Sequence, residues 1–207
     1  MTPQPQVKPS NPDDDVVSRQ LAILSNPIPD SILAGIKGNA PSDVKEIAVK
    51  WLNFFNAPAE KCFYGLSSGR KVVTEVSLDA DPLKEGQVLT LVCELDIAEE
   101  SLLDRHGKLA NAFIFSVLDE TVSSAVTALG YATGGSGICG VSQSLNTVFY
   151  NTVDLGARLR FVNTTLTATP ETTACRCEVW DLTQRRLVAT GVFIGMPSSS
   201  PRQAARL

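Results

Sequence analysis

Histidine is almost absent from this sequence: the 207-residue chain has one, His106. A metal site built from several histidines is therefore excluded, and His106 alone could serve a Ser/His or Cys/His pair. His106 stands in a polar stretch before Gly107, where it is either a catalytic base or an ordinary exposed loop residue. We predict no bound metal ion and no redox cofactor.

An excess of positive charge is also missing, since 18 Lys and Arg residues face 22 Asp and Glu residues. We therefore expect no nucleic-acid partner. No run of about 18 apolar residues is present, so we expect no membrane span. The five cysteines are an odd number in a chain large enough to build its own core, which favours a reducing compartment over a disulfide scaffold.

The composition, 43% hydrophobic, suits one folded domain with tails. Residues 1–40 are rich in Pro, Ser, Asn and Asp, and we predict a loosely held tail or an arm that covers a partner. The predicted domain covers residues 41–196, and residues 197–207 form a second polar tail.

The apolar spacing predicts one helix and six strands around a central segment. The helix begins at Pro41-Ser42-Asp43 and carries an apolar stripe to about Asn56. Alternating or strongly apolar runs predict strands. These runs cover residues 70–79, 87–97, 141–150, 157–168, 173–182 and 186–195.

The central segment, residues 110–129, has apolar residues on every side of the helical wheel, which predicts a helix buried nearly all round and ended by Gly130. A curved antiparallel sheet closing around that helix gives an α+β fold. The only charges in the segment are Asp119 and Glu120. Either Asp119 is a buried carboxylate with a raised pKa, suited to a general base, or both emerge where the helix leaves its cover.

Residues 135–140 spell G-x-G-x-x-G, but the predicted helix precedes them and a strand follows. A dinucleotide site needs the opposite order, so we predict a flexible loop.

Several segments of the chain, taken together, resemble the hotdog-fold acyl-CoA thioesterases, of the branch that includes the phenylacetyl-CoA type. The resemblance covers about residues 70–196. It is carried by the segment from Asp104 to Gly130, by the block Gly140 to Tyr150, and by two short later motifs. The later motifs are Leu155-Gly156-Ala157-Arg158-Leu159 and Arg186-Leu187-Val188-Ala189-Thr190-Gly191.

The resemblance implies the hotdog fold, a homodimer or dimer of dimers with a shared site, and an acyl-CoA or acyl-carrier thioester as substrate. It assigns Asp119 as general base or nucleophile and Ser142 as the hydroxyl that orients water. It assigns Asp104 as the polar residue that completes the site from the loop before the helix. The backbone N–H groups of Asn111 and Ala112 would stabilise the oxyanion, as a helix N-terminus can.

The helix start departs from the family, which has His-Gly-Gly where this chain has Ala110-Asn111-Ala112. His106 lies four residues too early to replace that histidine. Two hypotheses follow: an acyl thioester hydrolase, or a non-hydrolytic hotdog protein that binds or remodels acyl or polyketide thioesters. The C-terminal Ala205-Arg206-Leu207 resembles a peroxisomal address, so we expect a cytoplasmic or peroxisomal protein.

Overall fold

The computed structural model describes residues 22, 25–56, 71–81, 85–135, 137, 140–169 and 171–196. Residues 1–21 and 197–207, including Ala205-Arg206-Leu207, lie outside this part, as do Cys62 and Cys139. The helices are α2 (Asp30–Gly35), α3 (Ser42–Asn56) and α5 (Asn111–Ala132), with a 3-10 turn η1 (Glu100–Leu102). The strands are β1 (Val72–Ala80), β2 (Gln87–Asp96), β3 (Val141–Phe149), β4 (Arg158–Ala168), β5 (Thr173–Asp181) and β6 (Arg186–Met196).

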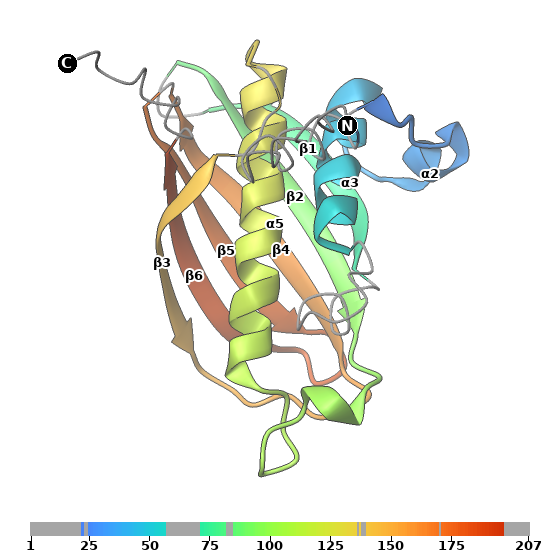
Figure 1. Cartoon of the computed structure of the whole chain (residues 1–207), viewed down its shortest axis with the longest axis vertical. Coiled ribbons are helices and arrows are strands. Elements are labelled where there is room, and N and C mark those ends of the chain that lie inside the picture. The colour runs from blue at the N-terminus through green and yellow to red at the C-terminus, as the bar shows by residue number, and fades with distance from the viewer. Residues whose placement is uncertain are drawn as a thin grey trace, which may run out of the picture.

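The six strands form one antiparallel sheet in the order β1-β2-β4-β5-β6-β3. Helix α5 lies along one face of this sheet, with α3 beside it (Figure 1). The predicted α+β layout, a sheet around one long helix, is confirmed. The core sits between this helix and the sheet because alternate strand residues point inward, as Leu159, Phe161 and Asn163 do along β4.

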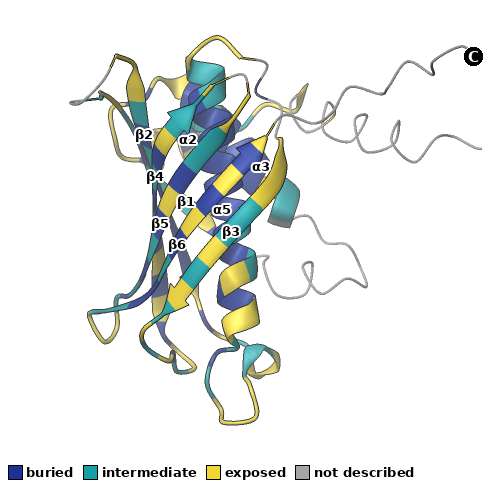
Figure 2. Ribbon diagram, turned by 90° about the vertical axis from the view of Figure 1, so that its left-hand side faces the viewer, coloured by how far each residue is buried: buried dark blue, intermediate teal, exposed yellow. Residues whose placement is uncertain are grey.

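Helix α5 differs from its prediction at both ends. It continues past Gly130 to Ala132, and Gly134, with φ +92°, is the first residue to take the left-handed conformation that ends helices. Its first turns are not buried all round: Asn111, Ala112 and Phe115 are exposed, and the lower end of α5 is partly yellow in Figure 2.

By length and hydropathy alone α5 could cross a membrane, and it is the one described helix of which this is true. However, 78% of its most apolar stretch is buried inside the fold. A core helix meets the same criteria, so the apolar character of α5 is explained by its contacts with the sheet and α3.

The folded body begins before residue 41, where we predicted the domain to start. Leu33 on α2 and the following Ile36 and Ala40 are buried. The chain then runs along the outer edge of β1, where Lys37 N donates to Thr74 O (3.0 Å) and Val76 N donates to Lys37 O (3.0 Å). This segment belongs to the fold and covers one edge of the sheet.

The other edge of the sheet, β3, is paired with β6 on one side only within the described chain. Val141 and Val148 on this strand are 53% and 55% exposed, and Tyr150 follows at 52%. An unpaired strand edge with exposed apolar residues is a ready surface for pairing with another chain. The two edges of the sheet are therefore unlike: β1 is covered and β3 is open.

Candidate active site

Asp119 and Ser142 meet at the open edge of the sheet. Asp119 lies in the third turn of α5, and Ser142 is the second residue of β3. The Ser142 hydroxyl donates to Asp119 Oδ1 at 3.0 Å. Two residues to which the resemblance assigned the site's chemistry, separated by 23 positions in the chain, are thus in direct contact.

The environment of Asp119 suits a base. Its side chain is half-buried, and burial raises the pKa of the Asp119 carboxyl above its ordinary value. The hydrogen bond from Ser142 lowers the pKa and offsets part of this effect. A carboxylate with a raised pKa accepts a proton more readily near neutral pH.

Glu120, the next residue along α5, has a different environment. Its side chain is 4% exposed and forms an ion pair of 2.6 Å with Lys71 Nζ, whose side chain is 0% exposed. Burial raises the pKa of Glu120 and lowers the pKa of Lys71. The two charges in α5 therefore do not emerge together: Glu120 is enclosed, while Asp119 borders the solvent.

Lys71 is a residue that our sequence analysis did not single out. A lysine just before a strand gives no sign of burial, because such positions are usually solvated. Only the unexplained charge at Glu120 in an apolar helix could have signalled that a partner was needed.

The start of α5 leaves two backbone N–H groups open. The chain leading into it is fixed by Leu109 N donating to Val153 O (2.8 Å) and Ala110 N donating to Leu102 O (2.9 Å). The N–H groups of Asn111 and Ala112 have no acceptor among the described residues, and both residues are exposed. Unpaired N–H groups at a helix N-terminus favour negative charge, so these amides can bind an oxyanion.

Asp104 forms its hydrogen bonds within its own turn. Asp104 Oδ1 accepts hydrogen bonds from Lys108 N (3.1 Å) and His106 N (2.8 Å), and these bonds hold the pKa of Asp104 below its ordinary value. No described contact joins Asp104 to Asp119 or Ser142. Asp104 lies instead in the loop that leads to the N-terminal end of α5.

His106 and the described cysteines, Cys93, Cys175 and Cys177, take no part in this arrangement. His106 is exposed, and its Nε2 accepts a hydrogen bond from Arg105 Nε at 3.0 Å. Cys175 and Cys177 are two positions apart on β5 and share a buried face, and burial raises the pKa of both thiols. The described residues contain no group of three or more His, Cys, Asp or Glu side chains able to hold a metal ion.

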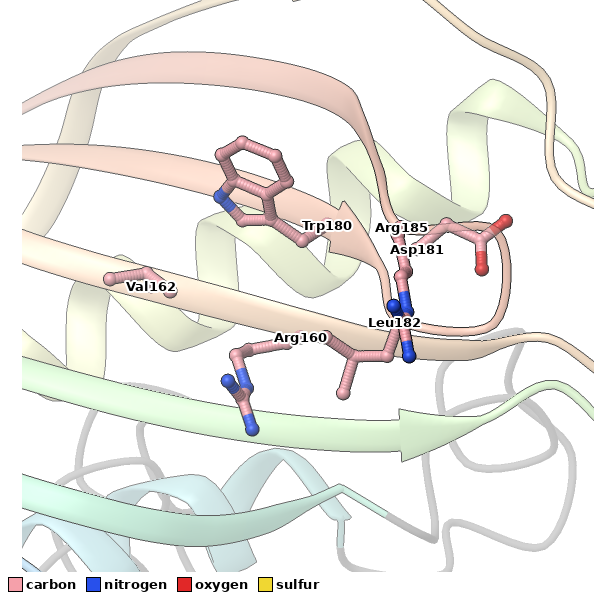
Figure 3. A pocket seen from close by; sticks show the side chains of 6 residues that line it. All are labelled: Arg160, Val162, Trp180, Asp181, Leu182 and Arg185. Carbon is pink, nitrogen blue, oxygen red and sulfur yellow. The ribbon is translucent and has the colours of Figure 1, made fainter.

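A separate hollow of about 470 Å³ opens on the opposite face of the sheet. Its lining includes Arg160, Trp180 and Arg185, and α5 lies behind the strands in this view (Figure 3). Arg160 is paired with Glu94 at 2.7 Å. This hollow contains neither Asp119 nor Ser142, so we place the candidate site at the α5–β3 side.

Solved structures resemble the whole fold. Thioesterase superfamily member 2 of zebra fish superimposes with a TM-score of 0.55 at 17% identity, covering 71% of this chain and 95% of that chain. The protein of the same name from Mus musculus gives a TM-score of 0.52 at 14% identity, with 72% and 93% covered. This is the hotdog fold.

The fold predicted from the sequence is therefore confirmed, over most of the length of these thioesterases. No protein-family model matches the chain, and no curated protein sequence matches it. At these identities the likeness concerns the fold, so the chemistry must be argued from the chain's own residues.

Proposed function

We propose that this protein hydrolyses an acyl thioester whose thiol is coenzyme A or an acyl-carrier group. The observation that carries the proposal is the contact between Asp119 and Ser142, at the point where the buried helix faces an open sheet edge. The hotdog fold shared with thioesterases adds support.

In the proposed reaction Asp119 acts as general base, the simpler of the two roles that its position allows. Asp119 takes a proton from a water molecule that Ser142 helps to orient, and the oxygen of that water attacks the thioester carbonyl carbon. The carbonyl electron pair moves onto oxygen, and backbone N–H groups stabilise this oxyanion. When the intermediate collapses, the carbon–sulfur bond breaks and the thiolate takes the proton from Asp119. Water, a carboxylate and amides suffice for these steps.

The separation along α5 supports a site that two copies share. Asn111 and Asp119 are eight residues apart, which corresponds to about 12 Å along the helix axis. An oxyanion donor and a base acting on one carbonyl must lie within roughly 9 Å, even with a water between them. The amides and the carboxylate are therefore better placed to serve one substrate from two copies than from a single chain.

A second copy paired through the open β3 edge would bring its helix start toward Asp119. The amides of Asn111 and Ala112, with Asp104 in the adjoining loop, would then come from that copy. The exposed Val141, Val148 and Tyr150 give this edge an apolar contact surface. We propose a homodimer with two equivalent shared sites, in the cytoplasm or the peroxisome.

The decisive test compares the wild type with Asp119→Asn on a panel of acyl-CoAs from acetyl to palmitoyl, together with aryl-CoAs. The assay follows the released thiol. We expect hydrolysis of at least one substrate by the wild type and a loss of about 100-fold or more in Asp119→Asn, because the base is removed while the shape is kept. Asp30→Asn on α2 is the matched control and should keep wild-type turnover.

Undiminished turnover in Asp119→Asn would contradict the assignment. The altered helix start, Ala110-Asn111-Ala112, favours the second candidate function, a protein that binds acyl or polyketide thioesters without hydrolysis. Binding of acyl-CoAs in calorimetry with no thiol release by the wild type would support that alternative.

A further inference from the structure

Trp51 links the N-terminal helix α3 to the loop before β3. Its side chain is 1% exposed, and its indole Nε1–H donates to Gly137 O at 2.7 Å, across 86 positions of the chain. A buried indole N–H without an acceptor is costly, so this bond fixes where the loop backbone runs.

Gly137 is held from three sides. It is buried and has φ +68°, and a Cβ at this position would lie 3.2 Å from the Tyr131 ring and 3.6 Å from Ile47 Cδ1. Tyr131 belongs to the end of α5 and Ile47 to α3. The Gly137 backbone is therefore confined between side chains of the two helices, and the Trp51 bond fixes the position of its carbonyl.

Ser142 follows five positions after Gly137. It stands at the beginning of β3, which is the edge strand and is hydrogen-bonded only to β6. The pairing with β6 is irregular here, because the register shifts between Ser142 and Ser144. Val141 and Ser142 pair with Met196 and Gly195 but are separated by this irregularity from the rest of β3. The placement of the Ser142 hydroxyl therefore also depends on the chain that precedes it.

We propose that Trp51 is a positioning residue for the candidate active site: its indole N–H fixes Gly137 O, five residues before Ser142, and so helps to set the Ser142 hydroxyl against Asp119. Helix α3 then serves the site as well as the core. The proposal rests on the proposed function for the reaction that the pair serves, but the Trp51–Ser142 coupling can be measured without turnover.

The measurement is the pKa of the Asp119 carboxyl, followed by ¹³C NMR and assigned with Asp119→Asn. In the described part of the chain, the groups that act on this carboxyl are Ser142 on β3 and, next to it on α5, Glu120 with its partner Lys71. Because the Ser142 bond lowers the pKa of Asp119, a misplaced hydroxyl must raise it.

We expect Trp51→Phe and Ser142→Ala each to raise this pKa, and the double variant to raise it no further than Ser142→Ala alone. The pH at which the hydrolysis rate falls on the acid side of its pH profile should rise by the same amount. Trp180→Phe is the matched control: Trp180 is the only other tryptophan, it lines the hollow on the far face, and its loss should leave the pKa unchanged.

Should Trp51→Phe fail to fold, Gly137→Ala displaces the same loop with the indole intact and should give the same rise. A pKa that stays at the wild-type value in Trp51→Phe while it rises in Ser142→Ala overturns the proposal, and so do additive shifts in the double variant. A wild type without thioesterase activity overturns the proposed function and leaves the NMR result to decide the coupling.

Discussion

Asp119 and Glu120 are adjacent acidic residues with opposite surroundings. Successive residues of a helix point about 100° apart, so one carboxylate faces the open β3 edge and the other faces the buried Lys71. Lys71 neutralises Glu120 within the core. Asp119 therefore has a neighbouring negative charge that is already paired, which leaves burial as the main influence on its pKa.

The raised pKa of Asp119 predicts that Asp119→Asn is more stable than the wild type at pH 7. The folded state holds the Asp119 proton more tightly than the unfolded chain does, so this group contributes stability at low pH. That contribution is lost as the pH rises through the raised pKa. Urea unfolding should show the advantage of the Asn variant at pH 7 and its disappearance toward pH 3.

Equal unfolding free energies for the two proteins at pH 7 would contradict the burial argument for Asp119. Asp30→Asn, an exposed change in α2, serves again as the control for removing a negative charge.

At the residue scale, the sequence alone singled out Asp119 as a site residue but did not single out the residues around it. Asp119 and Glu120 are the two charges in an apolar segment, where burial makes a charge costly, and this pointed to Asp119. The pairing with Ser142 came from the family resemblance, since nothing in a 23-residue spacing fixes a contact. Lys71 could not be predicted, because its burial depends on how β1 and α5 pack in three dimensions.

Helix α5 shows how an element can be predicted correctly and its exposure incorrectly. The apolar wheel predicted burial on all sides, yet Phe115 is 41% exposed on a face shared with Asn111 and Asp119. A helical wheel shows which sides of a helix are apolar. It does not show whether the same chain or another molecule covers each side. A second copy or a bound substrate on this face would cover the exposed Phe115 ring.

We expect Lys71→Met to lower the free energy of unfolding by about 3–5 kcal/mol, because it leaves Glu120 buried without a counter-charge. The double variant Lys71→Met/Glu120→Leu should recover most of this loss, since it removes both charges. Urea unfolding at pH 7 measures both. Arg176→Met is the control, because the Arg176–Glu178 pair is 3.9 Å apart and exposed, and should cost within about 1 kcal/mol.

A Lys71→Met protein as stable as the wild type would mean that Glu120 is neutral in the folded state and needs no partner.

The segment along the β1 edge predicts a specific glycine effect. Gly38 has φ +91°, and a Cβ there would lie 2.2 Å from Val76 O, a backbone atom that cannot move away. We expect Gly38→Ala to lower the free energy of unfolding by about 2–3 kcal/mol. Gly107→Ala is the control: its φ is +71° with open space around the Cβ, so only the backbone cost of about 1–2 kcal/mol remains.

Equal losses in the two glycine variants would show that the edge segment can separate from β1 without penalty.

At the element scale, local patterns were enough to predict the strands and α3, because strand alternation and a helical apolar stripe depend only on residues close together in the sequence. The end of α5 was misplaced because Gly130 is tolerated inside the helix, whereas Gly134 takes the left-handed conformation. The bonding of Lys37 to β1 joins residues almost 40 positions apart. The position of β3 beside β6 is equally non-local, so neither could be predicted from local patterns.

For the whole molecule, the proposed chemistry takes the amides from one copy and Asp119 from the other, and so predicts a homodimer. This prediction can be tested by complementation. Asn111→Pro removes one oxyanion N–H at the first helical position, where proline fits, and the preceding Ala110 already has the extended ψ of 129° that proline demands. Asp119→Asn removes the base.

Each variant alone should be inactive, but a heterodimer of the two contains one intact site out of two. We expect it to show about half of the wild-type rate. Co-expression with two different affinity tags isolates the heterodimer, and thiol release measures its activity. An inactive heterodimer would mean that both groups act within one chain.

The unlike edges of the sheet also limit how far the assembly can grow. If both edges were open, copies could add one after another and the sheet could extend into a fibre. Here residues 37–40 occupy the β1 edge, so two copies joined through β3 present only covered strands at their ends. In the proposed dimer, growth through the sheet would therefore stop at two chains. We expect residues 37–40 to limit edge-to-edge association by occupying the β1 edge.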